Sequence, residues 1–369
     1  MTTDVDPRAP AFDRGKIAVP RSPAGRHGAR RLAFPLAVAA ILVPAGIVAV
    51  SAGATRVDWS VTFGVLASHL LPGFDAVEVA EADEVIVWLI RTPRVIVAAL
   101  VGAALAASGA LMQGLFRNPM AEPNIIGVSA GAVLGAVAVF VTGFGAESAV
   151  VLPLAAILGG LSALVVVYAV ATRGGATPVA TLLLSGIAIS ALLTAASSLL
   201  ISLNLVSWDA AQEIIFWTLG GVDNRTWTHV WISAPFVVPG VLASVCYARD
   251  LDLMLQGEET AAALGVEVES VKRSIILLSA VLTGSAVAVA GAVGFVGLIV
   301  PHLVRLIVGP AHGSLIPSSA LSGAVFLILC DLLARTIHPP VEVRLGIITA
   351  AFGAPFFLFL LIRRSREIV

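Results

Sequence analysis

Long apolar runs separated by short polar segments make up most of this 369-residue chain. Most runs have close to the roughly 20 residues that cross a ~30 Å hydrocarbon core as an α-helix. Lipid admits only helices or closed barrels, and barrel strands alternate apolar with polar residues, so these continuous runs predict an all-α membrane protein. The eighth run is short, as in a broken or tilted helix. The ten expected spans are 32–54, 93–115, 123–143, 150–171, 180–201, 229–247, 272–293, 295–309, 316–336 and 345–363.

An even number of spans places both termini on one side of the membrane. With the N-terminus inside, the inner face carries 16 of the 22 Lys and Arg residues and the outer face carries six. All six Trp residues then lie on the outer side, where an interfacial belt is expected. The positive-inside rule therefore predicts that both termini are cytoplasmic.

The first 31 residues are polar and rich in Pro and Arg, which predicts a disordered cytoplasmic tail before a membrane domain at 32–369. A cleaved signal peptide is the alternative, because Ala52-Gly53-Ala54 resembles a cleavage site. The run 32–54 is longer than the roughly 7–15 residues of a signal h-region, which favours the tail.

A charged segment at 249–273 separates the sixth and seventh spans on the inner face. Its middle, 253–264, has helix formers and no proline, and Gly265 follows, so we expect one short helix there. A solvated loop is one interpretation, and a docking surface for a cytoplasmic partner is the other. On the outer face, 55–92 and 202–228 are either connecting loops or binding surfaces, and the second should contain a short surface helix.

Composition agrees with a membrane protein and indicates an external energy source. The chain is 58% hydrophobic and 12% charged, with a mean hydropathy of +1.00, whereas soluble domains have roughly 25% charged residues. No GxxxxGK[ST] phosphate loop, HExxH or CxxC motif occurs. Cys246 and Cys330 sit in apolar runs as packing residues. Asp331 is the one clear intramembrane carboxylate, and Arg335 one turn later predicts a local ion pair. An ion-driven carrier needs more such groups.

The chain contains a weak internal repeat and many small residues. A shift of 182 residues aligns Gly102 with Gly284, and Pro119 with Pro301, in spans of opposite direction. Inverted repeats of this kind are typical of transporters. Glycines also recur every fourth position at 127, 131 and 135, and every third at 291, 294 and 297, which predicts close helix packing.

Several stretches resemble the FecCD/BtuC-like permease subunits of type II ABC importers for vitamin B12, ferric siderophores and haem. The resemblance covers nearly everything after residue 31. It rests on RTPRVIVAALVGAALAASGALMQGLFRNPMAEPNIIGVSAGA (91–132), LMLQGEETAAALGV (253–266), GFVGLIVPHLVRLIVG (294–309), DLLAR (331–335) and LGIITAAFGAPFFLFLL (345–361).

The resemblance implies a ten-helix, multi-pass subunit of the cytoplasmic membrane that pairs with a second copy or a close paralogue. Two separate ATPase subunits dock on its inner face, and a periplasmic or lipid-anchored binding protein docks on its outer face. This chain would then be no enzyme and would bind no cofactor, metal or nucleic acid, because ATP and Mg²⁺ belong to the ATPases.

The resemblance also assigns residues. The family's coupling helices, which seat in a groove of the ATPase, match Gln256, Gly257, Glu258, Glu259, Ala262, Leu264 and Gly265. The family's outer arginines, which pair with glutamates of the binding protein, match Arg91, Arg94 and Arg335. Arginine suits bidentate pairing with carboxylates. Snorkelling anchors at helix ends are the alternative for these three residues.

An inner gate would include Asn118 and Met120 after the second span. Its other members are Thr177, Pro178, Val179 and Ala180 before the fifth. The family member compared has Leu where Met120 stands and a Ser/Thr-rich turn at 177–180, so this chain departs from the family in the gate. Pro301-His302 suggests a haem ligand, but the same pair accompanies cargoes without haem, which favours a structural role.

The sequence therefore predicts a permease subunit that moves a ferric siderophore or haem across the cytoplasmic membrane. A cobalamin permease, an ion-driven secondary carrier and a non-transporting receptor are the alternatives.

Overall fold

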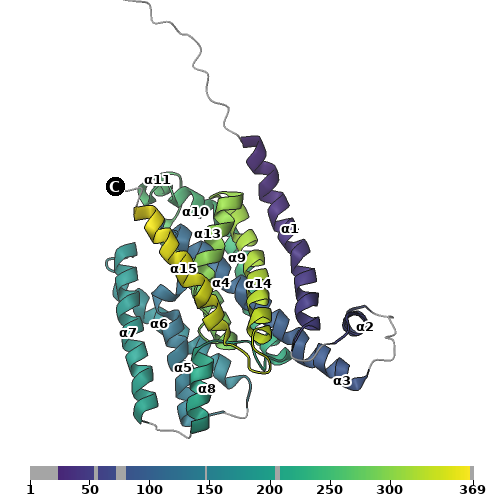
Figure 1. Ribbon diagram of the computed structural model, residues 1–369. Coiled ribbons are helices and arrows are strands. Elements are labelled where there is room, and N and C mark those ends of the chain that lie inside the picture. The colour runs from purple at the N-terminus through teal and green to yellow at the C-terminus, as the bar shows by residue number, and fades with distance from the viewer. Residues whose placement is uncertain (1–23, 54–56, 72–79, 146–147, 204–207, 366–369) are drawn as a thin grey trace, which may run out of the picture.

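The computed structural model describes residues 24–53, 57–71, 80–145, 148–203 and 208–365, and these residues form a bundle of helices (Figure 1). The elements in chain order are α1 (Ala24–Ser51), α2 (Trp59–Leu70), α3 (Glu81–Glu84), the π-helix η1 (Val85–Arg91), α4 (Thr92–Leu115), the 3₁₀-helix η2 (Pro123–Ile126), α5 (Val128–Thr142), α6 (Val151–Ala171), α7 (Val179–Leu203), α8 (Trp208–Thr218), α9 (Trp227–Cys246), α10 (Ala248–Met254), α11 (Glu258–Ala263), α12 (Val268–Ala290), α13 (Val296–Val308), α14 (His312–Thr336) and α15 (Leu345–Ser365).

Each expected span coincides with a helix of this bundle. Eight helical stretches among the described residues are long and apolar enough to cross a membrane, whereas α5 and α13 are apolar but shorter. The ends differ in places. The first helix begins at Ala24 rather than at residue 32, and the rest of the expected tail, 1–23, lies outside the described residues. The outer segment 55–92 is more helical than expected, because it holds α2, α3 and η1.

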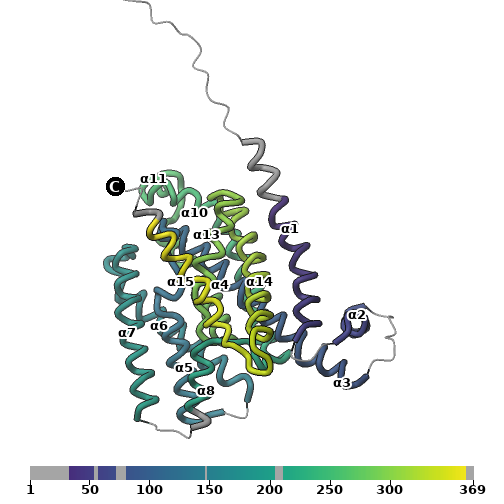
Figure 2. Tube along the Cα trace, in the orientation of Figure 1, coloured from purple at the N-terminus to yellow at the C-terminus, as the bar shows by residue number. Residues whose placement is uncertain are grey.

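The bundle has two ends that carry different polar residues. We call the end with α10 and α11 the coupling end, and the opposite end, with Arg91, Arg94 and Arg335, the arginine end. In Figures 1 and 2, α1 runs away from the coupling end and α15 runs back toward it. The surface helix expected in 202–228 is α8, which lies at the arginine end.

The centre of the bundle is α4, which packs against α13 and α14 through glycines. A Cβ atom at Gly102 would overlap the carbonyl oxygen of Gly323 in α14, and one at Gly109 would overlap the backbone of Gly297 in α13. Only hydrogen allows these backbones to approach so closely, because apolar burial does not drive helices together in lipid. Close packing was predicted for the glycines at 127, 131 and 135, and it is confirmed at Gly131 and Gly135, where a Cβ would overlap backbone carbonyl oxygens of α6.

The chain leaves helical structure between α12 and α13. The helix α12 ends at Ala290, and α13 begins after Phe295, whose φ of +68° is unusual for a residue with a side chain. The glycines at 291, 294 and 297 therefore do not form one helix ridge, which corrects that expectation. The register of the repeat also fails here, because Pro301 lies inside α13 whereas Pro119 lies in the loop after α4.

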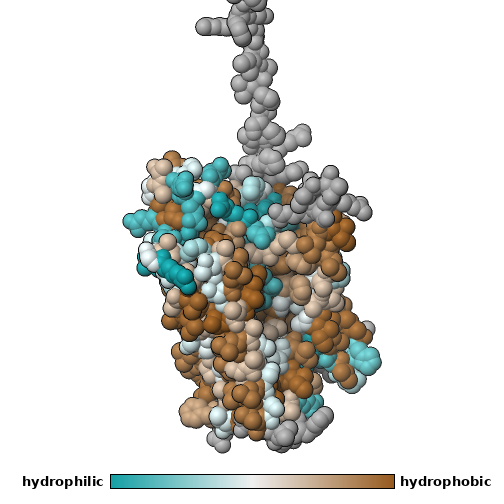
Figure 3. All heavy atoms as spheres, turned by 90° about the vertical axis from the view of Figure 1, so that its left-hand side faces the viewer, coloured by the Kyte–Doolittle hydropathy of each residue, from teal (hydrophilic) through white to brown (hydrophobic). Residues whose placement is uncertain are grey.

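The surface agrees with a membrane-spanning bundle. Figure 3 shows the face on the left-hand side of Figure 1, where apolar residues cover most of the height and polar residues gather at the coupling end. The helix α7 has large exposed apolar side chains along its length, such as Leu184 and Leu192. Such a face suits lipid or a second membrane protein.

Candidate functional site

The polar segment at the coupling end forms two short helices, so the single helix expected at 253–264 is wrong. The first, α10, ends at Met254, and α11 begins at Glu258. Between them Gly257 adopts φ +116° and ψ +148°, a backbone conformation that only glycine adopts readily. The chain therefore turns sharply at Gly257, and α11 lies across the end of the bundle (Figure 1).

The C-terminus of α11 is held by a Schellman motif. Gly265 has φ +89°, its N–H donates to the carbonyl of Ala262 at 3.0 Å, and the N–H of Val266 donates to that of Ala261 at 3.0 Å. This confirms that Gly265 ends the helix. Ala261, within α11, is fully buried, whereas Leu264, directly after the helix, is 59% exposed. The outer surface of α11 thus presents an apolar side chain on a short, closed helix.

The remaining coupling residues divide between solvent and the protein. Gln256, Glu259 and Ala262 are exposed. Glu258 instead turns inward, and its Oε2 lies 2.6 Å from the ammonium of Lys272 in α12. Lys272 also contacts Glu269 Oε1 at 3.0 Å and the carbonyl oxygen of Thr177 at 3.4 Å. Sequence reasoning counted Lys272 only as an inner-face cation.

A second polar contact holds α10. Asp252 Oδ1 accepts hydrogen bonds from the backbone N–H of His312 at 2.9 Å and lies 2.6 Å from its Nδ1. His312 is fully buried and begins α14, so the carboxylate of Asp252 caps that helix. Both short helices at the coupling end are therefore joined to long helices of the bundle.

The arginine end contains a charge cluster centred on Asp331. Asp331 accepts from Arg94 with both carboxylate oxygens: Nη2 donates to Oδ1 at 2.8 Å, and Nε donates to Oδ1 at 3.0 Å and to Oδ2 at 3.2 Å. The predicted Asp331–Arg335 ion pair is present at 3.4 Å, but it is longer. Glu342 adds a second carboxylate, which contacts Nη1 and Nη2 of Arg94 at 3.0 and 2.9 Å.

The other two arginines bind backbone carbonyls at the end of α1. Arg91 Nη1 donates to the carbonyls of Val50 and Ser51 at 3.0 and 2.8 Å. Arg335 Nη1 donates to that of Ala52 at 3.0 Å, and Nη2 donates to that of Ala49. Both side chains are buried, so neither is a snorkelling anchor in this conformation. Their role in docking stays a prediction.

The expected gate residues lie at the coupling end in two separate turns. Asn118 is exposed, and its Oδ1 accepts from the backbone N–H of Met120 at 3.0 Å. Thr177 is buried, and its hydroxyl contacts Thr172 Oγ1 at 2.9 Å and Tyr168 OH at 3.3 Å. Pro178 and Ala180 are exposed and Val179 is half-buried. The structure does not join the two turns by a hydrogen bond among the residues it describes.

Two further polar groups lie outside the predicted sites. Glu122, half-buried in the loop after α4, accepts a hydrogen bond from the N–H of Phe295 at 2.8 Å, so Asp331 is not the only carboxylate inside the bundle. At the arginine end, Asp223 contacts Arg344 at 2.8 Å, and the Arg344 guanidinium lies 3.8 Å from the ring centroid of Phe216. These contacts join distant segments, which no local pattern in the sequence indicates.

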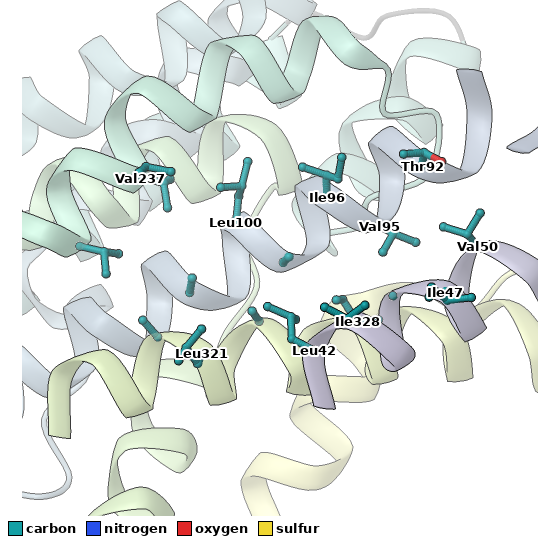
Figure 4. A pocket seen from close by; sticks show the side chains of 18 of the residues that line it. Leu42, Ile47, Val50, Thr92, Val95, Ile96, Leu100, Val237, Leu321 and Ile328 are labelled. Carbon is teal, nitrogen blue, oxygen red and sulfur yellow. The ribbon is translucent and has the colours of Figure 1, made fainter. Parts of the chain in front are cut away.

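An apolar cavity of about 700 Å³ lies between α1, α4, α9 and α14 (Figure 4). The cavity is lined by apolar residues such as Leu42, Leu100, Val237 and Ile328, and Thr92 is the polar residue in the lining. Such a lining offers a polar chelate almost no hydrogen bonds.

His302 contacts the ring of Phe356 edge-to-face, with ring centroids 5.8 Å apart, which agrees with a structural role for the Pro301-His302 pair.

Comparison with known proteins identifies the family to which this chain belongs. The family model described as "FecCD transport family" matches residues 41–363, nearly the whole described bundle. The chain belongs to the FecCD transport family. Its resemblance to FecCD/BtuC-like permeases is thereby confirmed.

Relatives of the FecCD chain cover most of its length. It is 48% identical over 79% of its residues to the cobalamin import system permease BtuC of Halobacterium salinarum, covering 76% of that protein. It is 40% identical over 76% of its residues to the hemin transport permease HmuU of Yersinia pestis, covering 84% of it. A metal-chelate type ABC transporter solved in an inward-facing conformation aligns with a TM-score of 0.77 at 30% identity, covering 89% of this chain and 98% of that one.

The FecCD chain is therefore the permease subunit of an ABC importer and a multi-pass protein of the plasma membrane. Members of this family work with ATPase and substrate-binding partners and are not themselves enzymes.

Proposed function

We propose that this permease moves an iron complex, a ferric siderophore or haem, into the cytoplasm when separate ATPase subunits push on α10 and α11. The observation that carries the proposal is the construction of α11. It is short, closed by a Schellman motif, joined to α12 by an ion pair, and exposes Leu264. A rigid segment of this kind can transmit a displacement to the bundle. Since the sequence has no phosphate loop, the ATP site belongs to the partner.

Iron complexes are favoured as cargo because several relatives carry them, including the hemin permease of Yersinia pestis and the Fe(3+) dicitrate permease FecD of Escherichia coli. Cobalamin is the second candidate, because the Halobacterium cobalamin permease is 48% identical to this chain. The assay described below separates the two.

A substrate-binding protein would dock at the arginine end. In the Asp331 cluster, Arg94 is the cation that has a partly exposed partner. The side chain of that partner, Glu342, is 38% exposed, and the side chain of Arg94 is 12% exposed. A glutamate of the binding protein could replace Glu342 on Arg94 while Asp331 keeps its own pair. Arg91 and Arg335 would need to leave their backbone carbonyls to bind the same partner.

A second permease copy would complete the pathway, and both termini would face the cytoplasm. The sparsely buried helices α7 and α15 offer faces for the second copy. The turns that contain Asn118 and Thr177 would then form the inner gate. The coupling end would be cytoplasmic, in line with its excess of Lys and Arg.

The direct test is reconstitution in lipid vesicles of this chain with its ATPase and binding proteins. We expect uptake to require ATP, and we expect the binding protein to stimulate hydrolysis when loaded with haem or a ferric siderophore. Stimulation by the cobalamin-loaded protein alone would select the second candidate. Pumping by the chain without the ATPase would contradict the proposal and favour an ion-driven carrier.

The coupling role has its own test. Two glycines inserted after Ala262 should abolish uptake while the ATPase still hydrolyses ATP, because a loosened α11 cannot transmit displacement. The matched control is the same insertion after Phe144, an exposed residue in the turn between α5 and α6. Unchanged uptake with the α11 insertion would refute the role.

A further inference from the structure

The ammonium of Lys272 lies inside the protein, where a charge is costly without partners. The residue is 3% exposed and lies in the first turns of α12, beneath α11. Transfer of an unpaired ammonium from water to the protein interior costs several kcal/mol, so a buried Lys requires close acceptors. The next residue, Arg273, is exposed and shows that a cation in this part of α12 can also face solvent.

The acceptors of Lys272 come from three segments. Glu258 is the first residue of α11, Glu269 lies one turn earlier in α12, and Thr177 precedes α7. Glu269 also accepts from the backbone N–H of Thr177 through its second oxygen, at 3.2 Å. The Thr177 peptide is thus held at its N–H by Glu269 and at its carbonyl by Lys272.

The turn at 172–178 is itself closed around Thr177. Arg173 and Ala176 form a two-way backbone bridge, at 3.0 and 3.2 Å, and the Thr177 hydroxyl contacts Thr172 and Tyr168. A displacement of Thr177 therefore carries the whole turn and the start of α7. Lys272 is the cation that joins this turn to α11.

We infer that Lys272 is a positioning residue for transport, which makes α11 and the turn before α7 move as one body. The inference rests on the proposed function, in which an ATPase displaces α11 and the turn belongs to the inner gate. If Lys272 releases Glu258, α11 can still follow the ATPase, but the turn no longer follows α11. The Lys272 contacts thus connect the site that receives the motion to a segment that opens the pathway.

The experiment uses the complete importer in nanodiscs and vesicles, with Glu258→Gln and Lys272→Met as test variants. Glu258→Gln is the more specific, because it removes the negative charge that α11 offers to Lys272 and leaves the contacts of Lys272 with Glu269 and Thr177 in place. Arg273→Gln is the matched control. Nitroxide labels at Ala176→Cys and Ala263→Cys, both exposed positions, report the distance between the turn and α11 after Cys246→Ser and Cys330→Ala substitutions.

In the wild type, we expect a narrow distance distribution that ATP addition does not change. In Glu258→Gln and Lys272→Met, ATP should broaden it, and uptake per ATP hydrolysed should fall roughly tenfold, within the range usual for coupling between two sites. Arg273→Gln should behave as the wild type. Hydrolysis and co-purification of the ATPase should persist in Lys272→Met, because Lys272 is buried beneath α11.

Three results would overturn the inference: unchanged uptake and distances in both test variants, loss of the ATPase from Lys272→Met, or equal loss of uptake in Arg273→Gln. Loss of the ATPase would mean that Lys272 supports the ATPase contact and not an internal connection. A wild-type importer that fails to transport with its ATPase would instead contradict the proposed function. The two failures are therefore distinguishable.

Discussion

Replacing Asp331 by Asn should destabilise the permease strongly, because two buried guanidinium groups share its carboxylate. The side chain of Asp331 is 2% exposed, and those of Arg94 and Arg335 are 12% and 4% exposed. Removing one partner of a buried ion pair costs about 3–5 kcal/mol, since the remaining charges stay in a medium of low dielectric constant. Glu342 still contacts Arg94 in this variant, so we expect the lower part of that range, about 3 kcal/mol.

The assay is unfolding by SDS in mixed micelles, followed by circular dichroism at 222 nm. The matched control is Glu342→Gln, which removes a carboxylate from the same guanidinium but whose side chain is 38% exposed. Solvent screens such a pair, so its loss should cost about 1 kcal/mol or less. Equal free energies of unfolding for the two variants would refute the reasoning, because they would place the Asp331 cluster in solvent.

Two further predictions concern other contacts of the bundle. Gly102→Ala should lower the free energy of unfolding by about 3 kcal/mol, because the new methyl group overlaps the backbone of Gly323. The control Gly64→Ala should not lower it, because a methyl group there meets open space. Equal effects of the two substitutions in the same SDS titration would contradict the packing argument. Asp223→Asn should cost about 1 kcal/mol at pH 7. Burial raises the pKa of Asp223, but Arg344 outweighs it and holds that pKa below its ordinary value. The stability that Asp223 contributes is thus fully present above its unfolded-state pKa of about 4 and is lost as pH falls through the lower folded-state pKa. The unfolding midpoints of the wild type and Asp223→Asn should therefore converge in acid. A constant difference between the two midpoints from pH 7 to pH 3 would contradict this reasoning.

The spans were predictable because their length and continuity depend on the bilayer, which every segment meets in the same way. The helix α13 was located correctly although it is short, since Gly294 and Gly309 bracket its apolar run. The helix α2 was missed. Its sequence WSVTFGVLASHL has too few residues to span a membrane, and hydropathy alone does not separate such a helix from a loop.

The candidate sites were predictable as segments but not as contacts. The sequence placed the coupling residues in one polar segment, yet it did not show that Glu258 faces Lys272 while Glu259 faces solvent. It paired Asp331 with Arg335, one turn away, and missed Arg94, which is distant in the chain and closer in space. Local spacing identifies neighbours on one helix, whereas a contact between helices depends on their packing.

The unequal burial of the helices limits which parts of the permease can rearrange. In the helical stretch Glu81–Leu115, which ends with α4, 78% of the most apolar 18-residue window is buried. The corresponding share is 17% in α7 and 22% in α15. Sliding or rotating α4 would bring residues that have a Cβ atom to the positions of Gly102 and Gly109, against the carbonyl groups of Gly323 and Gly297. We therefore expect α4, α13 and α14 to keep one arrangement throughout the transport cycle, while the peripheral helices α7 and α15 change position around them.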